Sequence, residues 1–190
     1  MFKLGWHKLS WRSKNQKLID NALSLNPEGV LKDFLMTPLV DSQTYADEAE
    51  YFVVDFETTG LDHKKDHIIS VGFTEIKEGR IQLHSSQHHV VKTEQKLKSE
   101  SVIIHQITDD EVSTGIPVKQ MMNLLLQHMA GKVVVAHYKN IEQKFIQHIS
   151  ESLFGHQLPL QLVDTLIIER NKLSKLNQPI LPNQLRLFNL

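Results

Sequence analysis

The sequence predicts an α/β domain with a helical segment in front of it. Three strand-type runs come first in that domain, at 51–54, 68–76 and 81–91. Helical patterns then alternate with short apolar runs as far as residue 175, and this alternation is typical of α/β domains. The 190 residues are enough for one domain of ordinary size and an extension.

The individual elements follow from local patterns. Residues 1–48 are expected to form a helical extension, in which Asn26-Pro27 separates two stretches of partly helical spacing. The second and third strands are predicted to form a hairpin, because a short turn with glycine, Lys77-Glu78-Gly79-Arg80, joins them. The remaining pattern predicts helices and short strands, which are a helix at 117–129, a strand at 132–136, a helix at 141–154, a strand at 160–163 and a helix at 164–175.

The composition is that of a soluble globular protein, with 41% hydrophobic and 23% charged residues. The chain has no cysteine, which excludes disulfides, thiol catalysis and cysteine-ligated zinc. No apolar run approaches the roughly 20 residues of a membrane span, and the N-terminus lacks the apolar core of a secretory signal. We therefore expect neither a membrane partner nor export.

Charge is unevenly distributed along a chain whose formal net charge is only −1. Residues 1–19 carry basic side chains and no acid, and the same holds after Glu169. Residues 41–66 instead hold eight acids against Lys64 and Lys65. An acidic region that can hold cations, between basic segments, favours an enzyme that cleaves a phosphate polymer. Solvated surface charge remains the simpler explanation for the individual lysines.

The first strand ends in Asp55-Phe56-Glu57-Thr58-Thr59-Gly60. Residues two apart on a strand share a face, so Asp55 and Glu57 project together and Phe56 enters the opposite layer. Two carboxylates this close repel each other unless a cation lies between them, and carboxylate oxygens suit Mg²⁺ or Mn²⁺ better than zinc or copper. The turn offers hydroxyls, backbone N–H groups and a flexible Gly60 to a ligand. A charged strand end followed by an ordinary turn is the structural alternative.

This strand-borne Asp-x-Glu-Thr-Thr-Gly resembles the first motif of the DnaQ-like (DEDDh) 3′–5′ exonucleases, which include the epsilon proofreading subunit of bacterial DNA polymerase III. The predicted order of elements matches their ribonuclease H-like fold, a mixed five-stranded sheet flanked by helices. The resemblance covers about residues 51–190 and implies an exonuclease domain over 49–190. It also implies a cytoplasmic enzyme with Mg²⁺ or Mn²⁺ in a two-metal site, which acts on a single-stranded DNA or RNA 3′ end. A DNA polymerase subunit is the implied protein partner.

Residues 133–145 resemble the second motif of that family, an apolar strand, a histidine and an acid at the start of the next helix. Glu142 occupies the position of the usual aspartate, and Tyr138 stands where asparagine is common. Glutamate keeps the charge but adds a methylene, so either the helix or the metal must shift. We expect Glu142 to reach a metal, directly or through water. The alternative is a helix-start glutamate that the helix dipole favours.

The resemblance also implies which residues bind substrate. The turn would hold the 3′-terminal nucleotide, with Leu61 wedged against a base. The residues implied in substrate binding are Thr58, Thr59, Gly60, Leu61, His105 and His137. Asp164 is expected to cap a helix rather than to bind metal. A zinc site at His84 and His88 is disfavoured, because no third ligand is evident.

The third motif of the family is a histidine followed five residues later by an aspartate, on the final helix. Residues 181–190 resemble the helix that precedes this motif, and no such pair follows them in the sequence. In the family this histidine is the general base and the aspartate completes the metal site. We therefore expect a C-terminally incomplete exonuclease that is weak or inactive in this form, because losing one such group typically removes ~10²–10⁴-fold of the rate.

Three functions remain open at this point. The leading hypothesis is release of nucleoside 5′-monophosphates from single-stranded or frayed 3′ ends, with Asp55, Glu57 and Glu142 as catalytic metal ligands. The second is a non-catalytic nucleic-acid-binding or polymerase-associated module that has kept the fold. The third is another ribonuclease H-like nuclease, in which Asp164 would supply an extra acid.

Overall fold

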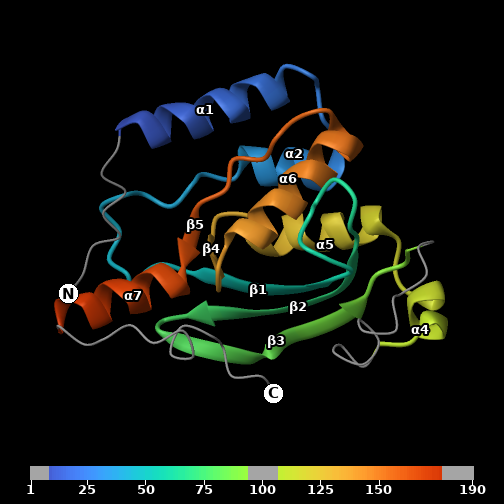
Figure 1. The fold of residues 1–190 in the computed structure, drawn as a ribbon. Helices are drawn as coiled ribbons and strands as arrows, with labels where there is room; N and C mark the ends of the chain where they lie inside the picture. Colours follow the sequence, from blue (N-terminus) through green and yellow to red (C-terminus); the bar gives the residue numbers. More distant parts are fainter. Residues whose placement is uncertain (1–8, 94–106, 177–190) are drawn as a thin grey trace.

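The computed structural model describes residues 9–93 and 107–176, and a five-stranded sheet lies at their centre (Figure 1). The strand order is β3-β2-β1-β4-β5. The pairs β1–β2 and β2–β3 are antiparallel, whereas β1–β4 and β4–β5 are parallel. The strands are β1 Tyr51–Thr58, β2 Ile68–Lys77, β3 Arg80–Val90, β4 Val133–Ala136 and β5 Leu162–Asp164. The predicted mixed five-stranded sheet is therefore confirmed.

The side chains of β1 alternate between the two faces of the sheet, as the sequence predicts. Phe52, Val54 and Phe56 are buried, whereas Asp55 is exposed and Glu57 is partly exposed. The hairpin from β2 to β3 is also as predicted, with Lys77 paired to Arg80. Both turn residues between them have positive φ, +52° at Glu78 and +69° at Gly79. Two residues with φ > 0 match the right-handed twist of a hairpin.

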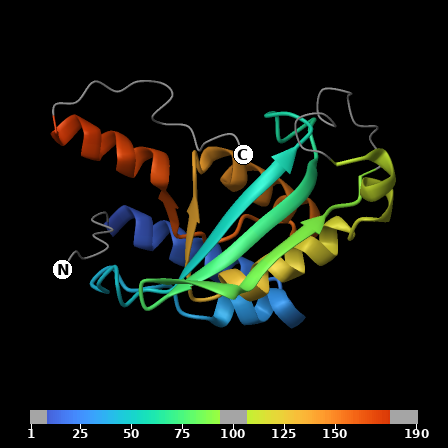
Figure 2. The same cartoon turned by 90° about the horizontal axis from the view of Figure 1, so that it is seen from below.

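The main helices lie together on one face of the sheet, and Figure 2 shows the sheet from the other face with these helices behind it. The described helices are α1 Leu9–Leu23, α2 Gly29–Met36, α4 Asp109–Thr114, α5 Val118–Met129, α6 Asn140–Phe154 and α7 Thr165–Lys175. Phe52 of the sheet packs with Met122 of α5 and Phe145 of α6 in one apolar core. None of the described helices is long and apolar enough to cross a membrane.

The helix α4 is absent from the sequence prediction, although a local signal for it exists. The Thr108 hydroxyl accepts a hydrogen bond from the Glu111 N–H, and the Glu111 carboxylate accepts one from the Thr108 N–H at 2.8 Å. This reciprocal capping box satisfies two N–H groups that the first helical turn leaves without partners. The sequence pattern Thr-x-x-Glu at residues 108–111 is the local signal that predicts the start of α4.

The helices of the N-terminal extension join the core of the sheet. Leu31, Phe34 and Leu35 of α2 are buried in the same apolar cluster as Phe52, and burial of each such side chain stabilises by about 1.5–3 kcal/mol. Beyond α2, the Gln161 side chain accepts from the Val40 N–H at 2.7 Å and donates to the Val40 carbonyl at 2.8 Å. The division of the chain at residue 48 stays a prediction, but α2 is packed as part of the sheet domain.

Candidate active site

The acidic residues of the two predicted motifs meet at one edge of the sheet. Asp55 lies near the carboxyl end of β1, and His137 follows directly on the end of β4. Glu142 lies in the first turn of α6, and Asp164 ends β5. Because β1, β4 and β5 are mutually parallel, their carboxyl ends meet at the same edge.

Glu142 is the most unusual of these residues, because its side chain is buried and incompletely paired. The residue is 2% exposed, and its Oε2 atom has no hydrogen-bond partner in the described part of the chain. Burial raises the pKa of Glu142 to about 7, and the charges of Asp55 and Asp164 act in the same direction. Hydrogen bonds from the backbone N–H groups of Glu142 and Phe56 oppose this rise. Glu142 is therefore an interior carboxylate, not a solvated one at a helix start.

Asp55 and Glu57 project from the same face of β1, and Asp55 is close enough to Glu142 for their charges to interact. Partial enclosure raises the pKa of Asp55 although the residue remains accessible to solvent, and the charge of His137 opposes the rise. In the described ranges, no three histidine or acidic side chains converge closely enough to form a cation site by themselves. The structure thus brings Asp55, Glu142 and His137 into one neighbourhood.

The histidine of the second motif is held by the start of α7. His137 Nδ1 lies 3.0 Å from the Thr165 hydroxyl oxygen, and that hydroxyl donates to the Ala136 carbonyl at 3.4 Å. Because the Thr165 hydroxyl proton is directed to the carbonyl, the hydroxyl oxygen is left to accept a hydrogen bond from His137 Nδ1–H. This hydrogen bond fixes the orientation of the imidazole ring. Asp164 accepts from the N–H groups of Leu166 at 3.0 Å and Tyr138 at 3.1 Å. Its predicted role as a helix cap is therefore confirmed.

The predicted substrate turn is organised by an acid that the sequence analysis missed. The Asp66 carboxylate accepts from the Asp62 N–H at 2.8 Å and from the Thr59 hydroxyl at 3.4 Å. Glycine at position 60 allows this approach, since a Cβ there would lie 2.5 Å from Asp66 Oδ2 and would displace the carboxylate. Nothing in the local pattern marks Asp66, because its partners become neighbours only when the loop closes.

The remaining substrate residues of the turn differ in exposure. The Thr58 hydroxyl donates to the Gly60 carbonyl at 2.8 Å and so faces its own turn. Leu61 is 72% exposed, so it is available to a ligand. His105 lies outside the described residues, as do residues 177–190, where the sequence analysis looked for the third motif.

A divalent cation suits the side chains at this edge. The Oε2 atom of Glu142 is buried without a partner, and its nearest charged neighbours are also acidic. An isolated buried carboxylate is costly unless it is protonated, paired or bound to a metal. Oxygen ligands from carboxylates match the preference of Mg²⁺ and Mn²⁺. The donor set therefore fits the metals that the sequence predicts.

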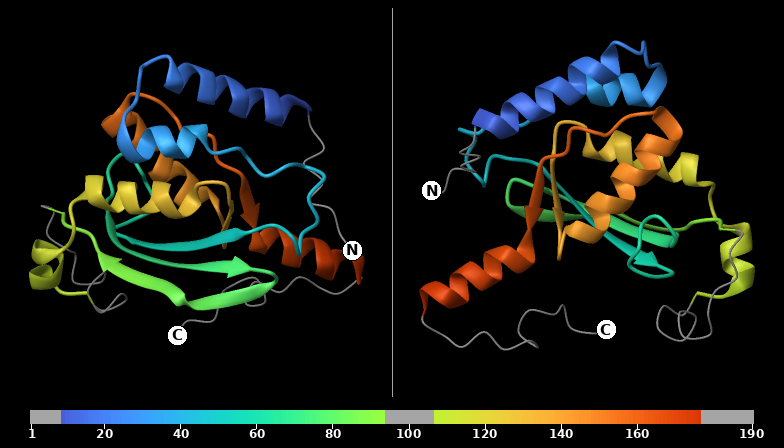
Figure 3. Two further views of the ribbon diagram at one scale, coloured as in Figure 1. Left: turned by 180° about the vertical axis from the view of Figure 1, so that it is seen from behind. Right: turned by 45° about the horizontal axis from the view of Figure 1, so that its top comes forward.

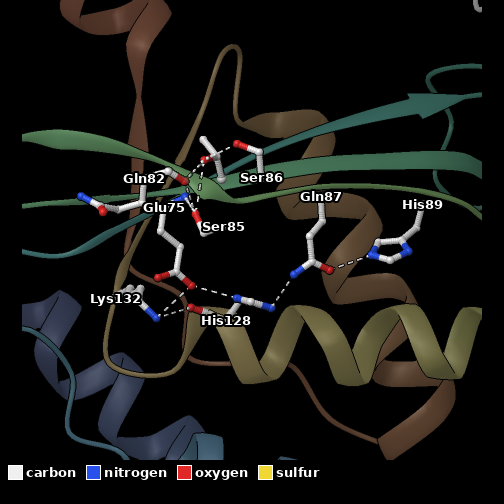
Figure 4. Close-up of polar contacts among 9 residues, drawn as sticks. Glu75, Gln82, Ser85, Ser86, Gln87, His89, His128 and Lys132 are labelled. Carbon is white, nitrogen blue, oxygen red and sulfur yellow. Dashed lines mark hydrogen bonds and ion pairs between the residues drawn. The ribbon is translucent and has the colours of Figure 1, made fainter.

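A second polar cluster lies between β2, β3 and α5, away from the end of β1 (Figure 4). The Glu75 carboxylate is 2.8 Å from His128 Nδ1 and 3.4 Å from the Lys132 ammonium. Burial raises the pKa of Glu75, but the hydrogen bond from His128 and the charge of Lys132 outweigh it and lower the pKa. Farther along β3, the His89 ring is 2.9 Å from the Gln87 side-chain oxygen. One oxygen of the Glu75 carboxylate, Oε1, therefore has two basic partners, and the contact with His128 attaches α5 to the sheet.

Comparison with proteins of known sequence identifies relatives over most of the chain. A 135-residue segment is 28% identical to the PolC-type DNA polymerase III of Thermotoga maritima, which covers 71% of this chain and 10% of the polymerase. The 3′-5′ exonuclease DinG of Staphylococcus saprophyticus is 26% identical over 116 residues, covering 61% of this chain and 13% of DinG. The chain thus spans about a tenth of the length of these relatives.

Solved structures with the same fold include exonuclease I. A structure of SSB/exonuclease I with the inhibitor CFAM aligns with a TM-score of 0.61 at 14% identity, covering 75% of this chain and 36% of the other. E. coli exonuclease I in complex with a 5cy-dT13 oligonucleotide aligns with a TM-score of 0.59 at 13% identity, covering 67% and 30%. The ribonuclease H-like fold implied by the sequence is confirmed. A family model for exonucleases, RNase_T, matches residues 52–190, and the chain therefore belongs to this exonuclease family.

Proposed function

We propose that this chain is a metal-dependent 3′–5′ exonuclease domain that removes nucleoside 5′-monophosphates from single-stranded or frayed 3′ ends. The observation that carries the proposal is the buried Glu142 carboxylate in the field of Asp55, with an Oε2 atom that has no partner in the described ranges. Two acids brought together from positions 87 residues apart, of which Asp55 raises the pKa of Glu142 by its charge, are suited to hold cations. Membership of the exonuclease family supports this chemistry.

Asp55, Glu57 and Glu142 are the proposed ligands of Mg²⁺ or Mn²⁺. When bound, such ions act as Lewis acids on a phosphoryl group and lower the pKa of a bound water. Asp55 is accessible to solvent, so it can face both an ion and a substrate phosphate. Glu142 is held from behind by its backbone hydrogen bonds, so only its Oε2 atom remains to be satisfied by a ligand.

The turn after β1 and the end of β4 are proposed to position the substrate. Thr58, Thr59 and Gly60 would form the turn that holds the 3′-terminal nucleotide, and the exposed Leu61 would contact its base. His137, oriented by Thr165, would contact the strand beside Asp55. His105 keeps its proposed role near the terminal nucleotide on the strength of the family resemblance.

The test is degradation of a 5′-labelled single-stranded oligonucleotide with Mn²⁺. Because the sequence predicts weak activity for this form of the chain, the assay uses protein in excess over oligonucleotide, and the wild-type chain should then give a ladder that shortens one nucleotide at a time. Asp55→Asn should abolish it, whereas Asp33→Asn, an exposed acid on α2 with the same change in charge, should not. A ladder that persists in Asp55→Asn would assign the activity to a contaminant or to another site and would contradict the proposal.

A second candidate, a nucleic-acid-binding module without catalysis, is favoured by one observation. Among described residues the acids do not form a complete three-ligand site, and a glutamate replaces the usual aspartate. Such a module would bind Mn²⁺ and oligonucleotide but leave the oligonucleotide intact. Calorimetric titration with Mn²⁺ beside the degradation assay distinguishes the two functions.

The substrate, partner and location are proposed from the relatives. Because several relatives are named as PolC-type DNA polymerases, we propose DNA as the substrate and a DNA polymerase as the partner. Both proposals place the protein in the bacterial cytoplasm.

A further inference from the structure

A polar cavity of ≈ 200 Å³ is lined by residues of α1, of the first half of α6 and of the segment that leads into β5. Figures 1 and 3 show α1 lying across the helix layer on the side away from the sheet. One water needs only about 10–15 Å³ of such space, so the cavity admits a group of several heavy atoms. Part of its lining comes from α1, outside the 52–190 segment that matches the exonuclease family. The cavity therefore depends on α1 as well as on the matched domain.

The cavity carries positive charge and no acidic lining residue. Lys14 of α1 and Lys139, at the start of α6, both line it. In the described ranges, no acidic side chain forms an ion pair with either lysine. Glu151, the acid that contacts the lining, is bound at 2.7 Å by the Gln157 side-chain amide. Two lysines without a fixed counter-charge attract an anion.

A buried donor without a partner lies in the same cavity. Asn15 is 5% exposed, and its side-chain nitrogen has no hydrogen-bond partner among the described residues. A buried amide left unpaired costs about 1–3 kcal/mol, so such groups usually meet a ligand or water. Asn15 lines the cavity. Its nitrogen is covered in the structure, so a rotation of this short side chain would be needed to turn its N–H groups towards an acceptor in the cavity.

The α6 side of the cavity follows a regular stripe. Lys139, Gln143 and Gln147 are spaced four residues apart, so they share one face of the helix. Glu142 lies on the adjacent, sheet-facing side. The stripe begins two residues after His137, and the residue between them, Tyr138, is 48% exposed with φ +57°. An exposed aromatic ring between two polar sites can stack on a base.

We propose that the α1–α6 cavity binds a phosphate group, and that this group belongs to the backbone of the strand whose 3′ end enters the candidate active site. The inference of a strand rests on the proposed function, whereas the phosphate site rests on Lys14, Asn15 and Lys139 alone. Phosphate offers several acceptor oxygens to one amide and two ammonium groups. The strand would cross Tyr138 on its way from the catalytic edge to the cavity, and the N-terminal helix would lengthen the footprint on nucleic acid.

The test measures binding of a fluorescent single-stranded oligothymidylate in EDTA, where no cleavage takes place. Lys14→Gln/Lys139→Gln should lower the affinity about tenfold or more. It should also reduce the slope of log affinity against log salt concentration by roughly 0.7, the contribution of one phosphate contact on a single strand. The matched control is Lys32→Gln/Lys119→Gln, which removes two exposed lysines outside the cavity. Equal affinities of the two double variants would overturn the proposal.

Asn15→Leu separates binding from folding. Leucine replaces an unpaired buried amide with an apolar group of similar size, so the free energy of unfolding should not fall, while oligonucleotide affinity should fall several-fold. Unchanged affinity with unchanged stability would contradict a role for Asn15. If the chain binds the oligonucleotide as described but does not degrade it, the proposed exonuclease function is contradicted while the proposed phosphate site is supported.

Competition identifies the source of the phosphate. Thymidine 5′-monophosphate and inorganic phosphate should displace the oligonucleotide only at concentrations far above its own Kd, because each occupies a single contact. Displacement by the free nucleotide at comparable concentration would overturn the strand assignment and assign the cavity to a released mononucleotide.

Discussion

Two glutamates of this fold, the partly buried Glu75 and the buried Glu142, have opposite electrostatic environments. Glu75 is bound by His128 and Lys132, and its pKa is lowered. Glu142 has acidic neighbours and an Oε2 atom without a partner in the described ranges, and its pKa is raised to about 7. The charge of Glu75 is balanced by groups of the protein itself, whereas the charge of Glu142 has to be balanced by a bound proton or cation. The difference separates a carboxylate that holds structure from one that is available for ligand binding.

The largest expected effect comes from removing the charge beside Glu142. Asp55→Asn should lower the exonuclease rate by about 10²–10⁴-fold and leave the free energy of unfolding unchanged or higher, because a repulsion is relieved. Single-turnover kinetics with Mn²⁺ and urea unfolding of the same preparations measure both. If Asp55→Asn also lowers the free energy of unfolding, then Asp55 stabilises the fold, as Glu75 does.

The stability of the metal-free protein should depend on pH through Glu142. Its folded pKa, about 7, exceeds its ordinary value of 4.5, so the folded state binds the proton more tightly. The contribution is therefore complete below about pH 4.5 and is lost as pH rises towards 7 and beyond, with an upper limit of about 3 kcal/mol. Urea unfolding in EDTA from pH 5 to 8 should show this fall, and Glu142→Gln should flatten it. If the free energy of unfolding of the wild-type protein does not change between pH 5 and 8, the raised pKa of Glu142 is contradicted.

Removing the charge of Glu75 should lower the free energy of unfolding, whereas removing the charge of Asp55 should not. Glu75→Gln leaves the 15% exposed Lys132 side chain without its anion, so we expect a loss of about 2 kcal/mol at pH 7. Glu169→Gln breaks an exposed ion pair with Lys172 and should change stability by less than about 0.5 kcal/mol. Equal effects in the two variants would mean that burial of the Glu75 cluster adds nothing to its strength.

The smallest expected effect concerns the support of His137. Thr165→Val removes the hydroxyl that lies 3.0 Å from Nδ1 and should reduce the rate several-fold at a stability cost of about 1 kcal/mol. Thr165→Ser retains the hydroxyl and should restore most of the rate. If serine and valine behave alike, the hydroxyl does not orient the ring.

Local patterns predicted the strands and most helices, because burial alternates along β1 and the positive φ angles of Glu78 and Gly79 suit a two-residue turn. The motifs likewise predicted that Asp55 and Glu142 would meet. The sequence could not predict the unpaired state of Glu142, the approach of Asp66 to Gly60, or the cavity at Asn15. Each of these depends on which atoms of distant segments arrive beside it, and no local periodicity records that.

The reciprocal hydrogen bonds between Val40 and Gln161 bear on the order of folding. They join residues 121 positions apart, so the segment that follows α2 gains this anchor only after β5 has reached the sheet. Long-range contacts of this kind close late, because the chain entropy of a large loop must first be overcome. During synthesis the ribosome exposes the two N-terminal helices long before it makes Gln161. These helices can pack onto the sheet only after most of the domain has been synthesised. The α1–α6 cavity is consequently among the last features to form.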